Sequence, residues 1–401
     1  MLVSALSPME PTKPQDQTRA SLAPPRVDPD AFTLADRPES VTSLVAALDS
    51  RPGAEVALDT EADSLHHYFE KACLLQLAFD GRAWLVDPLA PAVDLAPLLS
   101  RLSDRPLLLH GADYDLRLLK RGFGFSAARV FDTMIAAQLL GEPQIGLAAL
   151  AAKRLGVVLD KSSQRADWSE RPIPDHRAAY AAADVLHLAA LAASLRADLE
   201  AAGRLAWHAE ECERLLLSPM EPAPPDPEND WRVKGTNALS DRERAFLREL
   251  WSAREARARE IDRPPFRVAT NERLVEAARL AAAGERDPAR LIPSARGLPP
   301  AFARAVESAV ARAEALAPAD WPRRKSGSVR DADPALEAEV RRLKDRRDAL
   351  ARRHALDPGV LAPRALLVVA ARLKLETGSV TAEALVAAGA SRWRAALLAR
   401  G

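Results

Sequence analysis

The segment Glu55-Val56-Ala57-Leu58-Asp59-Thr60-Glu61 constrains the fold of this 401-residue chain more than any other stretch. The apolar run 56–58 follows Pro52-Gly53 and predicts a short buried strand. Side chains at i and i+2 of a strand point to the same face, so Asp59 and Glu61 should lie side by side. Adjacent carboxylates repel each other, and a divalent ion that prefers oxygen ligands, Mg²⁺ or Mn²⁺, relieves that repulsion. Taken alone, the pair also fits a strand that ends in a solvated acidic turn.

Short apolar runs and amphipathic runs alternate after this strand. Asp80-Gly81 separates two apolar runs, which is a strong hairpin signal, so the acidic strand should start an antiparallel meander. The later alternation predicts an α/β domain with a mixed sheet flanked by helices. The predicted strands are 55–60, 71–79, 82–86, 106–109 and 129–132, and the predicted helices are 34–48, 95–102, 113–119, 133–140, 147–155 and 175 to about 217.

Two further acidic positions stand out against their surroundings. Asp115 follows the buried run 106–109 and the turn His110-Gly111-Ala112. Tyr180 and Asp184 are spaced i, i+4 in an alanine-rich helix, so they share one face. An unpaired Asp on an apolar helix face is costly, which favours a functional role for Asp184. A surface Asp beside a core Tyr is the alternative.

Proline-rich stretches divide the chain. Residues 1–30 are rich in Pro, Ser and Thr and lack periodicity, so we expect them to be disordered. The segment 218–227 has five prolines and predicts a stiff linker. The expected domains are an α/β domain at 31–217, a linker at 218–230, an all-α module at 231–316, a linker at 317–334 and a second all-α module at 335–401.

The second half of the chain repeats itself and is basic. A shift of 93 residues superposes 247–278 on 340–371 and matches Arg254 with Arg347, Pro265 with Pro358 and Leu274 with Leu367. Two copies of one helical module are therefore expected, the second one truncated or divergent. Residues 1–230 carry 22 Lys and Arg against 34 Asp and Glu, whereas residues 231–401 carry 34 against 22. Such asymmetry suits a chain that brings a polyanion to bound metal, although basic helix faces are often simply solvated.

The apolar runs and the cysteine count indicate in which cellular compartment we expect the protein. The apolar runs are short and broken by charged residues, so we expect no transmembrane helix and no membrane partner. Cys73 and Cys212 are the only cysteines and lie far apart, which fits a reducing cytoplasm and excludes a disulfide framework or a cysteine zinc site.

The acidic positions resemble those of the DEDD family of 3′–5′ exonucleases. Segments 57–61, 110–116 and 180–184 resemble that family's three motifs, with Asp59, Glu61, Asp115 and Asp184 as the four acids. Tyr180 stands four residues before the last Asp, as in the tyrosine subclass. The histidine subclass has His one residue earlier, where this chain has Ala179.

One departure from the family pattern is an extra acid. Asp113 stands two residues before Asp115. We assign Asp115 to the site because Leu116 follows it and because its distance from His110 matches the family pattern. Asp113 should then face solvent or cap the helix.

Within that family the closest resemblance is to the ribonuclease D group. Segments 87–89, 160–164 and 168–172 resemble that group, and 231–265 resembles its HRDC helical modules. The resemblance covers about residues 35–400. It implies a ribonuclease H-like exonuclease fold followed by two HRDC-like modules.

The resemblance also implies an activity. The expected protein is a metal-dependent 3′–5′ exoribonuclease that acts on RNA with a free 3′ end, with tRNA precursors as the implied substrates and no predicted protein partner. Phosphodiester hydrolysis is well served by two divalent ions about 3.5–4 Å apart. Asp59 would bridge them, Glu61 and Asp184 would complete the water-activating site, and Asp115 would serve the second ion. Tyr180 would orient the water.

Other assignments are left open at this stage. Leu65, His66, Lys161 and Gln164 are candidate substrate contacts, although a loop residue without a role is the commoner case. Trp231 and Trp251 could stack on bases, but tryptophans of small helical modules are usually core residues. Rival functions are the same chemistry on single-stranded DNA and a non-catalytic nucleic-acid-binding protein.

Overall fold

The structure, a computed structural model, describes residues 31–221, 224–293, 297–324 and 333–399. The predicted disorder of residues 1–30 lies outside these ranges. A six-stranded mixed sheet forms the first domain, with the order β1-β4-β3-β2-β5-β6. Its strands are β1 Phe32–Ala35, β2 Val56–Ala62, β3 Ala72–Phe79, β4 Arg82–Val86, β5 Pro106–Leu109 and β6 Arg129–Asp132.

The predicted antiparallel meander is present. β2, β3 and β4 pair antiparallel, and β5 and β6 add in parallel beyond β2. Asp80 and Gly81 both have positive φ, 50° and 75°, as a two-residue hairpin turn requires. The edge strand β1 was not predicted, because residues 32–35 pair with β4, a partner that local sequence does not reveal.

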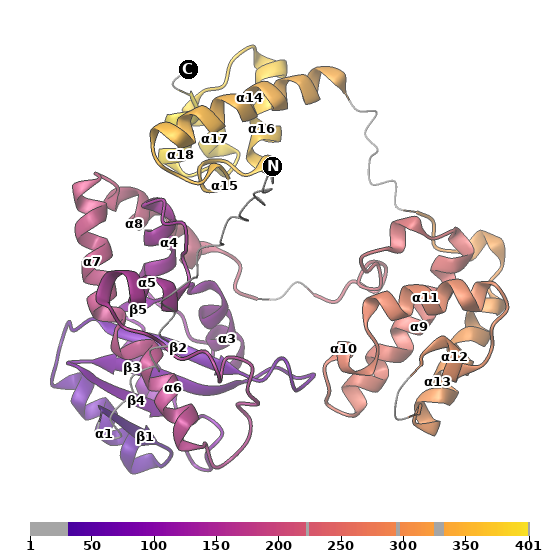
Figure 1. The fold of residues 1–401 in the computed structure, drawn as a ribbon, viewed down its shortest axis with the longest axis horizontal. Helices are drawn as coiled ribbons and strands as arrows, with labels where there is room; N and C mark the ends of the chain where they lie inside the picture. The colour runs from indigo at the N-terminus through magenta and orange to yellow at the C-terminus, as the bar shows by residue number, and fades with distance from the viewer. Residues whose placement is uncertain (1–30, 222–223, 294–296, 325–332, 400–401) are drawn as a thin grey trace, which may run out of the picture.

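Helices cover both faces of the sheet (Figure 1). Leu58 and Leu75 face a core shared with α1, α2 and α3, whereas Ala57 and Leu74 face α6. The two-residue period of β2 therefore places Asp59 and Glu61 on the α6 side. The helices of this domain are α1 Pro38–Asp49, α2 Ala96–Leu102, α3 Asp113–Phe123, α4 Thr133–Leu139, α5 Leu147–Leu155, α6 Asp175–Leu186, α7 Leu188–Ala201 and α8 Leu205–Leu217.

The single long helix predicted from 175 to 217 is three helices. It breaks at His187 and again at Gly203, which has φ 67°, a conformation that favours glycine. By length and composition the run Asp175–Ala201 resembles a membrane span. In the structure it is α6 and α7, whose buried residues pack in the cores of the first domain.

Two helical modules follow, and each has its own core. The helices α9 and α14 begin and end 93 residues apart, as the repeat predicts. Arg254 donates to the carbonyl of Ala269 and Arg347 to that of Ala362, so the repeat extends to matching hydrogen bonds. The helices are α9 Asp241–Glu260, α10 Pro265–Val268, α11 Asn271–Ala282, α12 Pro288–Leu291, α13 Pro300–Ala315, α14 Pro334–Arg353, α15 Pro358–Leu361, α16 Arg364–Thr377, α17 Ala382–Ala387 and α18 Arg392–Ala399.

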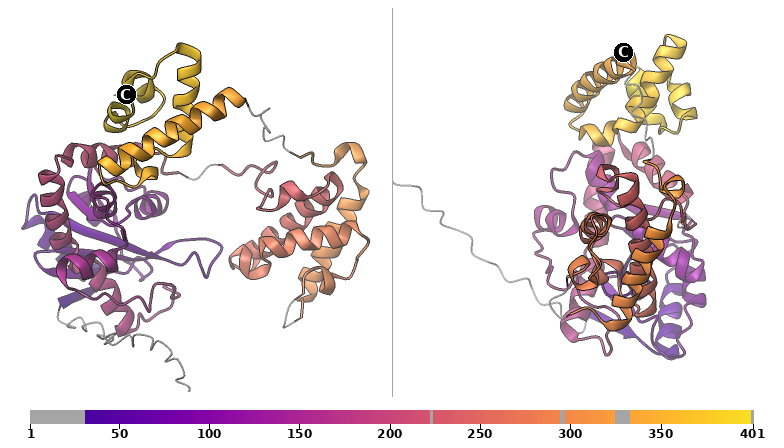
Figure 2. Two further views of the ribbon diagram at one scale, coloured as in Figure 1. Left: turned by 45° about the horizontal axis from the view of Figure 1, so that its top comes forward. Right: turned by 90° about the vertical axis from the view of Figure 1, so that its right-hand side faces the viewer.

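The second module packs on the first domain through a continuous apolar core. Trp207 of α8 stacks on Trp393 of α18 with ring centroids 4.7 Å apart. Arg394 pairs with Glu211 at 2.6 Å. Figure 2 shows this module seated against the helices of the first domain.

The first module contacts the sheet domain through the loop of residues 63–71, which we call the docking loop. Asp262 accepts hydrogen bonds from the backbone amides of Tyr68 and Phe69, at 3.0 and 3.2 Å. Its other carboxylate oxygen lies 2.7 Å from Nδ1 of His67. The docking loop connects β2 to β3, so the module attaches directly behind the acidic strand.

Candidate active site

Three carboxylates meet where β2 passes beneath α6. Asp59 and Glu61 come from β2 and Asp184 from α6, and one oxygen of each lies within 4.8 Å of the others. The strand period and the helix face that the sequence predicted place them together. All three side chains are partly buried.

Asp115 lies beside this cluster, at the start of α3. It is 5% exposed, and the Thr60 hydroxyl donates to its Oδ1 at 2.5 Å. Asp113, two residues earlier, is exposed and pairs with Arg117 at 2.8 Å. The two acids therefore have opposite environments, and of the two it is Asp115 whose charge interacts with the β2 carboxylates.

Burial raises the pKa of every carboxyl in the cluster, and repulsion from neighbouring carboxylates adds to the rise for Glu61, Asp115 and Asp184. Burial raises the pKa of Asp59 to about 6. Burial, and then the charges of Asp59, Asp184 and Asp115, raise the pKa of Glu61 to about 10. Burial and the charge of Asp59 raise the pKa of Asp184 to about 8. The pKa of Asp115 is also raised, first by burial and then by Asp59.

This cluster fits divalent cations. Its donors are all carboxylate oxygens, which Mg²⁺ and Mn²⁺ prefer, and bound positive charge would replace the protons that the raised pKa values retain. The buried side chain of Gln76, opposite Asp59 on β3, has no hydrogen-bond partner within the described ranges. A polar group left unpaired at this depth is typical of a site that binds something further.

Tyr180 lies one helical turn before Asp184. Its ring is 6.0 Å from that of the buried Trp168. Burial, followed by the charges of Asp184 and Glu61, raises the pKa of its hydroxyl. The hydroxyl therefore keeps its proton near neutral pH and can orient a water molecule, but it is not a base.

Asp132, at the end of β6, has a role in the site that the sequence patterns did not predict. Its carboxylate accepts the backbone amides of Gly111 and Ala112 at 3.0 and 2.8 Å, and that of Met134 at 2.8 Å. It thereby holds the turn before α3 and caps α4. An Asp directly before a predicted helix is an N-cap signal, so the cap could be predicted. Its contact with the turn before α3 depends on the neighbouring strand.

The four predicted substrate contacts lie outside the carboxylate cluster. Leu65 is 41% exposed on the docking loop. Nε2 of His66 lies 3.1 Å from the carbonyl of Arg165, so this ring braces two loops. Lys161 and Gln164 are exposed in a turn. Trp231 is 1% exposed and Trp251 packs against the same core, so neither is an open stacking surface.

The fold and the carboxylate arrangement are those of a 3′–5′ exonuclease. Residues 32–200 match the family model described as 3′-5′ exonuclease, and residues 243–287 match the HRDC domain. Over 297 residues the chain is 35% identical to ribonuclease D of Gluconacetobacter diazotrophicus, which covers 72% of this chain and 74% of that protein. The chain belongs to the ribonuclease D family.

Solved structures agree over most of the chain. The structure of Escherichia coli RNase D, described as an exoribonuclease involved in structured RNA processing, is 27% identical with a TM-score of 0.65. The match covers 86% of this chain and 91% of that one. A protein from Bifidobacterium adolescentis is 26% identical with a TM-score of 0.78, covering 92% and 95%. The predicted fold class, an α/β exonuclease domain followed by HRDC-like helices, is confirmed.

Proposed function

We propose that this chain removes nucleotides from the 3′ end of RNA and releases nucleoside 5′-monophosphates. The observation that carries the proposal is the meeting of Asp59, Glu61 and Asp184 within 4.8 Å in a ribonuclease D fold. Since the relatives from Gluconacetobacter diazotrophicus and Escherichia coli are ribonucleases D, RNA is the favoured substrate. Trimming of tRNA precursors in the cytoplasm is the specific role that we propose.

The chain's own residues have distinct parts in this scheme. We propose two divalent ions, Mg²⁺ or Mn²⁺, which when bound would activate water and stabilise the leaving oxygen. Asp59, Glu61 and Asp184 would hold one ion, and Asp59 and Asp115 the other. The Tyr180 hydroxyl would accept a hydrogen bond from the attacking water, or donate one to it, and so fix the direction of attack.

The helical modules would hold the body of the RNA. We propose that residues 231–316 and 335–401 act as two such modules, joined by linkers at 218–230 and 317–334. Their excess of Lys and Arg over Asp and Glu, 34 against 22 for residues 231–401, favours contact with phosphates.

The test is purified protein with RNA and DNA labelled at either end, in Mg²⁺, Mn²⁺ or excess chelator. We expect stepwise shortening of RNA from its 3′ end that the chelator stops. RNA that stays intact with every metal would contradict the proposal and favour a non-catalytic binding protein. Faster shortening of single-stranded DNA would identify DNA as the substrate.

A further inference from the structure

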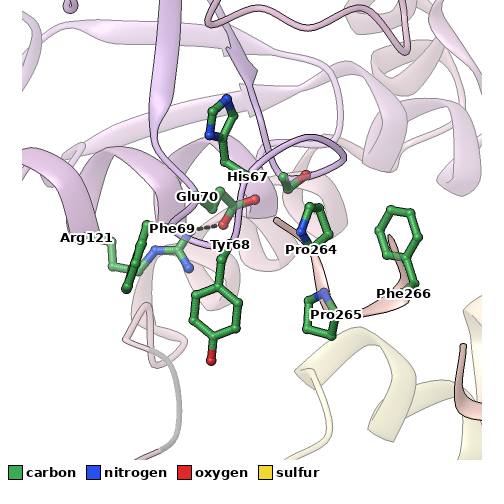
Figure 3. A pocket seen from close by; sticks show the side chains of 9 residues that line it. His67, Tyr68, Phe69, Glu70, Arg121, Pro264, Pro265 and Phe266 are labelled. Carbon is green, nitrogen blue, oxygen red and sulfur yellow. Dashed lines mark hydrogen bonds and ion pairs between the residues drawn. The ribbon is translucent and has the colours of Figure 1, made fainter. Parts of the chain in front are cut away.

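A hollow of about 480 Å³ lies between the docking loop and the first helical module, apart from the carboxylate cluster. The docking loop supplies Tyr68 and Phe69, α3 supplies Arg121, and the module supplies the segment 264–266 (Figure 3). The volume is in the range of ordinary small-ligand sites. Two separate domains therefore build one concave surface.

Exposed aromatic rings gather at this hollow. Phe69 is 58% exposed and Phe266 46% exposed, and both line it. Tyr114, 44% exposed, donates a hydrogen bond to Glu70 on its wall. In the described ranges the only other large exposed aromatic side chain is Phe123. Aromatic faces left open to water and clustered in this way are typical of a binding surface.

Positive charge accompanies these rings. The guanidinium group of Arg259 lies 5.4 Å from the Tyr68 ring, and that of Arg267 lies 5.5 Å from the Phe266 ring. Arg263 donates to the carbonyl of His66 at 3.2 Å. Across the part of the chain that the structure describes, none of these three arginines forms a salt bridge. By contrast, Arg121 is neutralised by Glu70.

The residues at the hollow are close neighbours in sequence of residues in the candidate active site. Ser64 lines it, and Glu61 stands just before in the sequence. Tyr114, which contacts its wall, directly precedes Asp115. A single RNA strand whose 3′ end lies at the carboxylates can therefore extend along the docking loop to the hollow.

We propose that this hollow is a stacking subsite for unpaired nucleotides upstream of the 3′ end of single-stranded RNA. Phe69 and Phe266 stack on bases, and the arginines of the first module contact the phosphates, the combination that binds single strands without reading sequence. The placement of the RNA rests on the proposed function. The subsite would let the first module add affinity for a 3′ tail without taking part in the chemistry.

The test uses the full chain and a double variant, Phe69→Ala with Phe266→Ala. Both side chains are exposed, so the fold should persist. The probe is an unstructured oligoadenylate with 2-aminopurine placed at successive positions, bound by protein that also carries Asp59→Asn so that it stays intact. We expect affinity to fall about 30-fold or more, since two stacked bases are lost, and the stacking quench of 2-aminopurine to disappear. Phe266→Tyr, which keeps an aromatic ring, should retain the affinity and the quench of the wild type. Leu34→Ala, at an exposed apolar residue on the edge strand β1, should change neither the affinity nor the quench.

Activity separates this inference from the function on which it rests. In the active background, the double variant should raise KM for the oligoadenylate and leave kcat, and cleavage of a dinucleotide too short to reach the hollow, unchanged. Unaltered affinity and quench would overturn the subsite, as would an equal loss on the dinucleotide. Wild-type protein that binds RNA but never shortens it, with affinity still dependent on Phe69 and Phe266, would refute the exonuclease and support the subsite.

Discussion

The hydroxyl of Thr60 donates a hydrogen bond to Oδ1 of Asp115 at 2.5 Å, which joins the acidic strand β2 to the start of α3. Thr60 points to the opposite face of β2 from its neighbours Asp59 and Glu61, and its hydroxyl fixes the carboxyl group that α3 supplies. The side chain between the two predicted acids therefore orients a third.

Removing this hydroxyl should weaken the site without unfolding the protein. A hydrogen bond to a charged group contributes about 1.5–3 kcal/mol, so Thr60→Val should raise the Mg²⁺ concentration needed for half-maximal cleavage about tenfold or more. Thr60→Ser should behave like the wild type. Equal metal dependence in the valine and serine variants would show that Asp115 does not need this contact.

The two acids at the start of α3 should respond differently to the same change. Asp115→Asn should reduce cleavage on the order of a thousandfold, because metal ligation supplies several kcal/mol of transition-state stabilisation. Asp113→Asn is the matched control, since that side chain is exposed and pairs with Arg117, a contact of about 0.5 kcal/mol. RNA affinity should be similar in both. A larger loss from Asp113→Asn would reverse the assignment.

The cluster should make metal-free stability depend on pH. The pKa of Asp184 rises from 3.8 to about 8 on folding, and that of Glu61 from 4.5 to about 10. Between the unfolded and the folded pKa of each carboxyl, the folded form binds more protons than the unfolded form. The free energy of unfolding therefore falls as pH rises through this window and levels off above the folded pKa values.

Thermal unfolding measured with and without Mg²⁺ checks this dependence. Because the ion replaces protons, the rise in Tm that Mg²⁺ causes should grow as pH increases toward about 8. Asp184→Asn should flatten the metal-free profile, and Asp113→Asn should leave it unchanged. A metal-free Tm that climbs with pH across this window would contradict the assigned shifts.

Asp262 should control how the first module is held. Its carboxylate binds His67 and the amides of Tyr68 and Phe69, so Asp262→Ala should free the module and increase the radius of gyration in solution scattering. Glu260→Ala is the control, because this exposed residue pairs with Arg257 of the same helix. Scattering curves that coincide for all three proteins would mean that other contacts suffice.

The second module should be part of the folding unit of the first domain. Trp393 is 5% exposed, stacks on Trp207 and donates to Glu211 at 2.7 Å. Trp393→Ala should lower the free energy of unfolding by about 3–5 kcal/mol, measured by denaturant titration. Leu375→Ala, at a residue 47% exposed on α16, should cost far less. Similar losses would argue against a shared core.

Local patterns in the sequence were enough to predict the main elements. Alternation on β2, the Asp80-Gly81 turn and the 93-residue repeat each depend on neighbours or on fixed spacing, so they survive without knowledge of the fold. They predicted the meander and the repeated helices, and the i, i+4 spacing of Tyr180 and Asp184 predicted their common face. Local pattern failed where a partner is distant, as for strand β1, or where a helix run is divided by a turn, as at His187.

The tertiary structure alone decided how these parts act on one another. It placed Asp132 under the turn that leads to α3. It also brought Asp262 to the docking loop. The sequence by itself determined which groups the site would contain, because residue types and short spacings are local. Their pKa values, the hollow and the docking of the modules depend on long-range packing, which no single segment encodes.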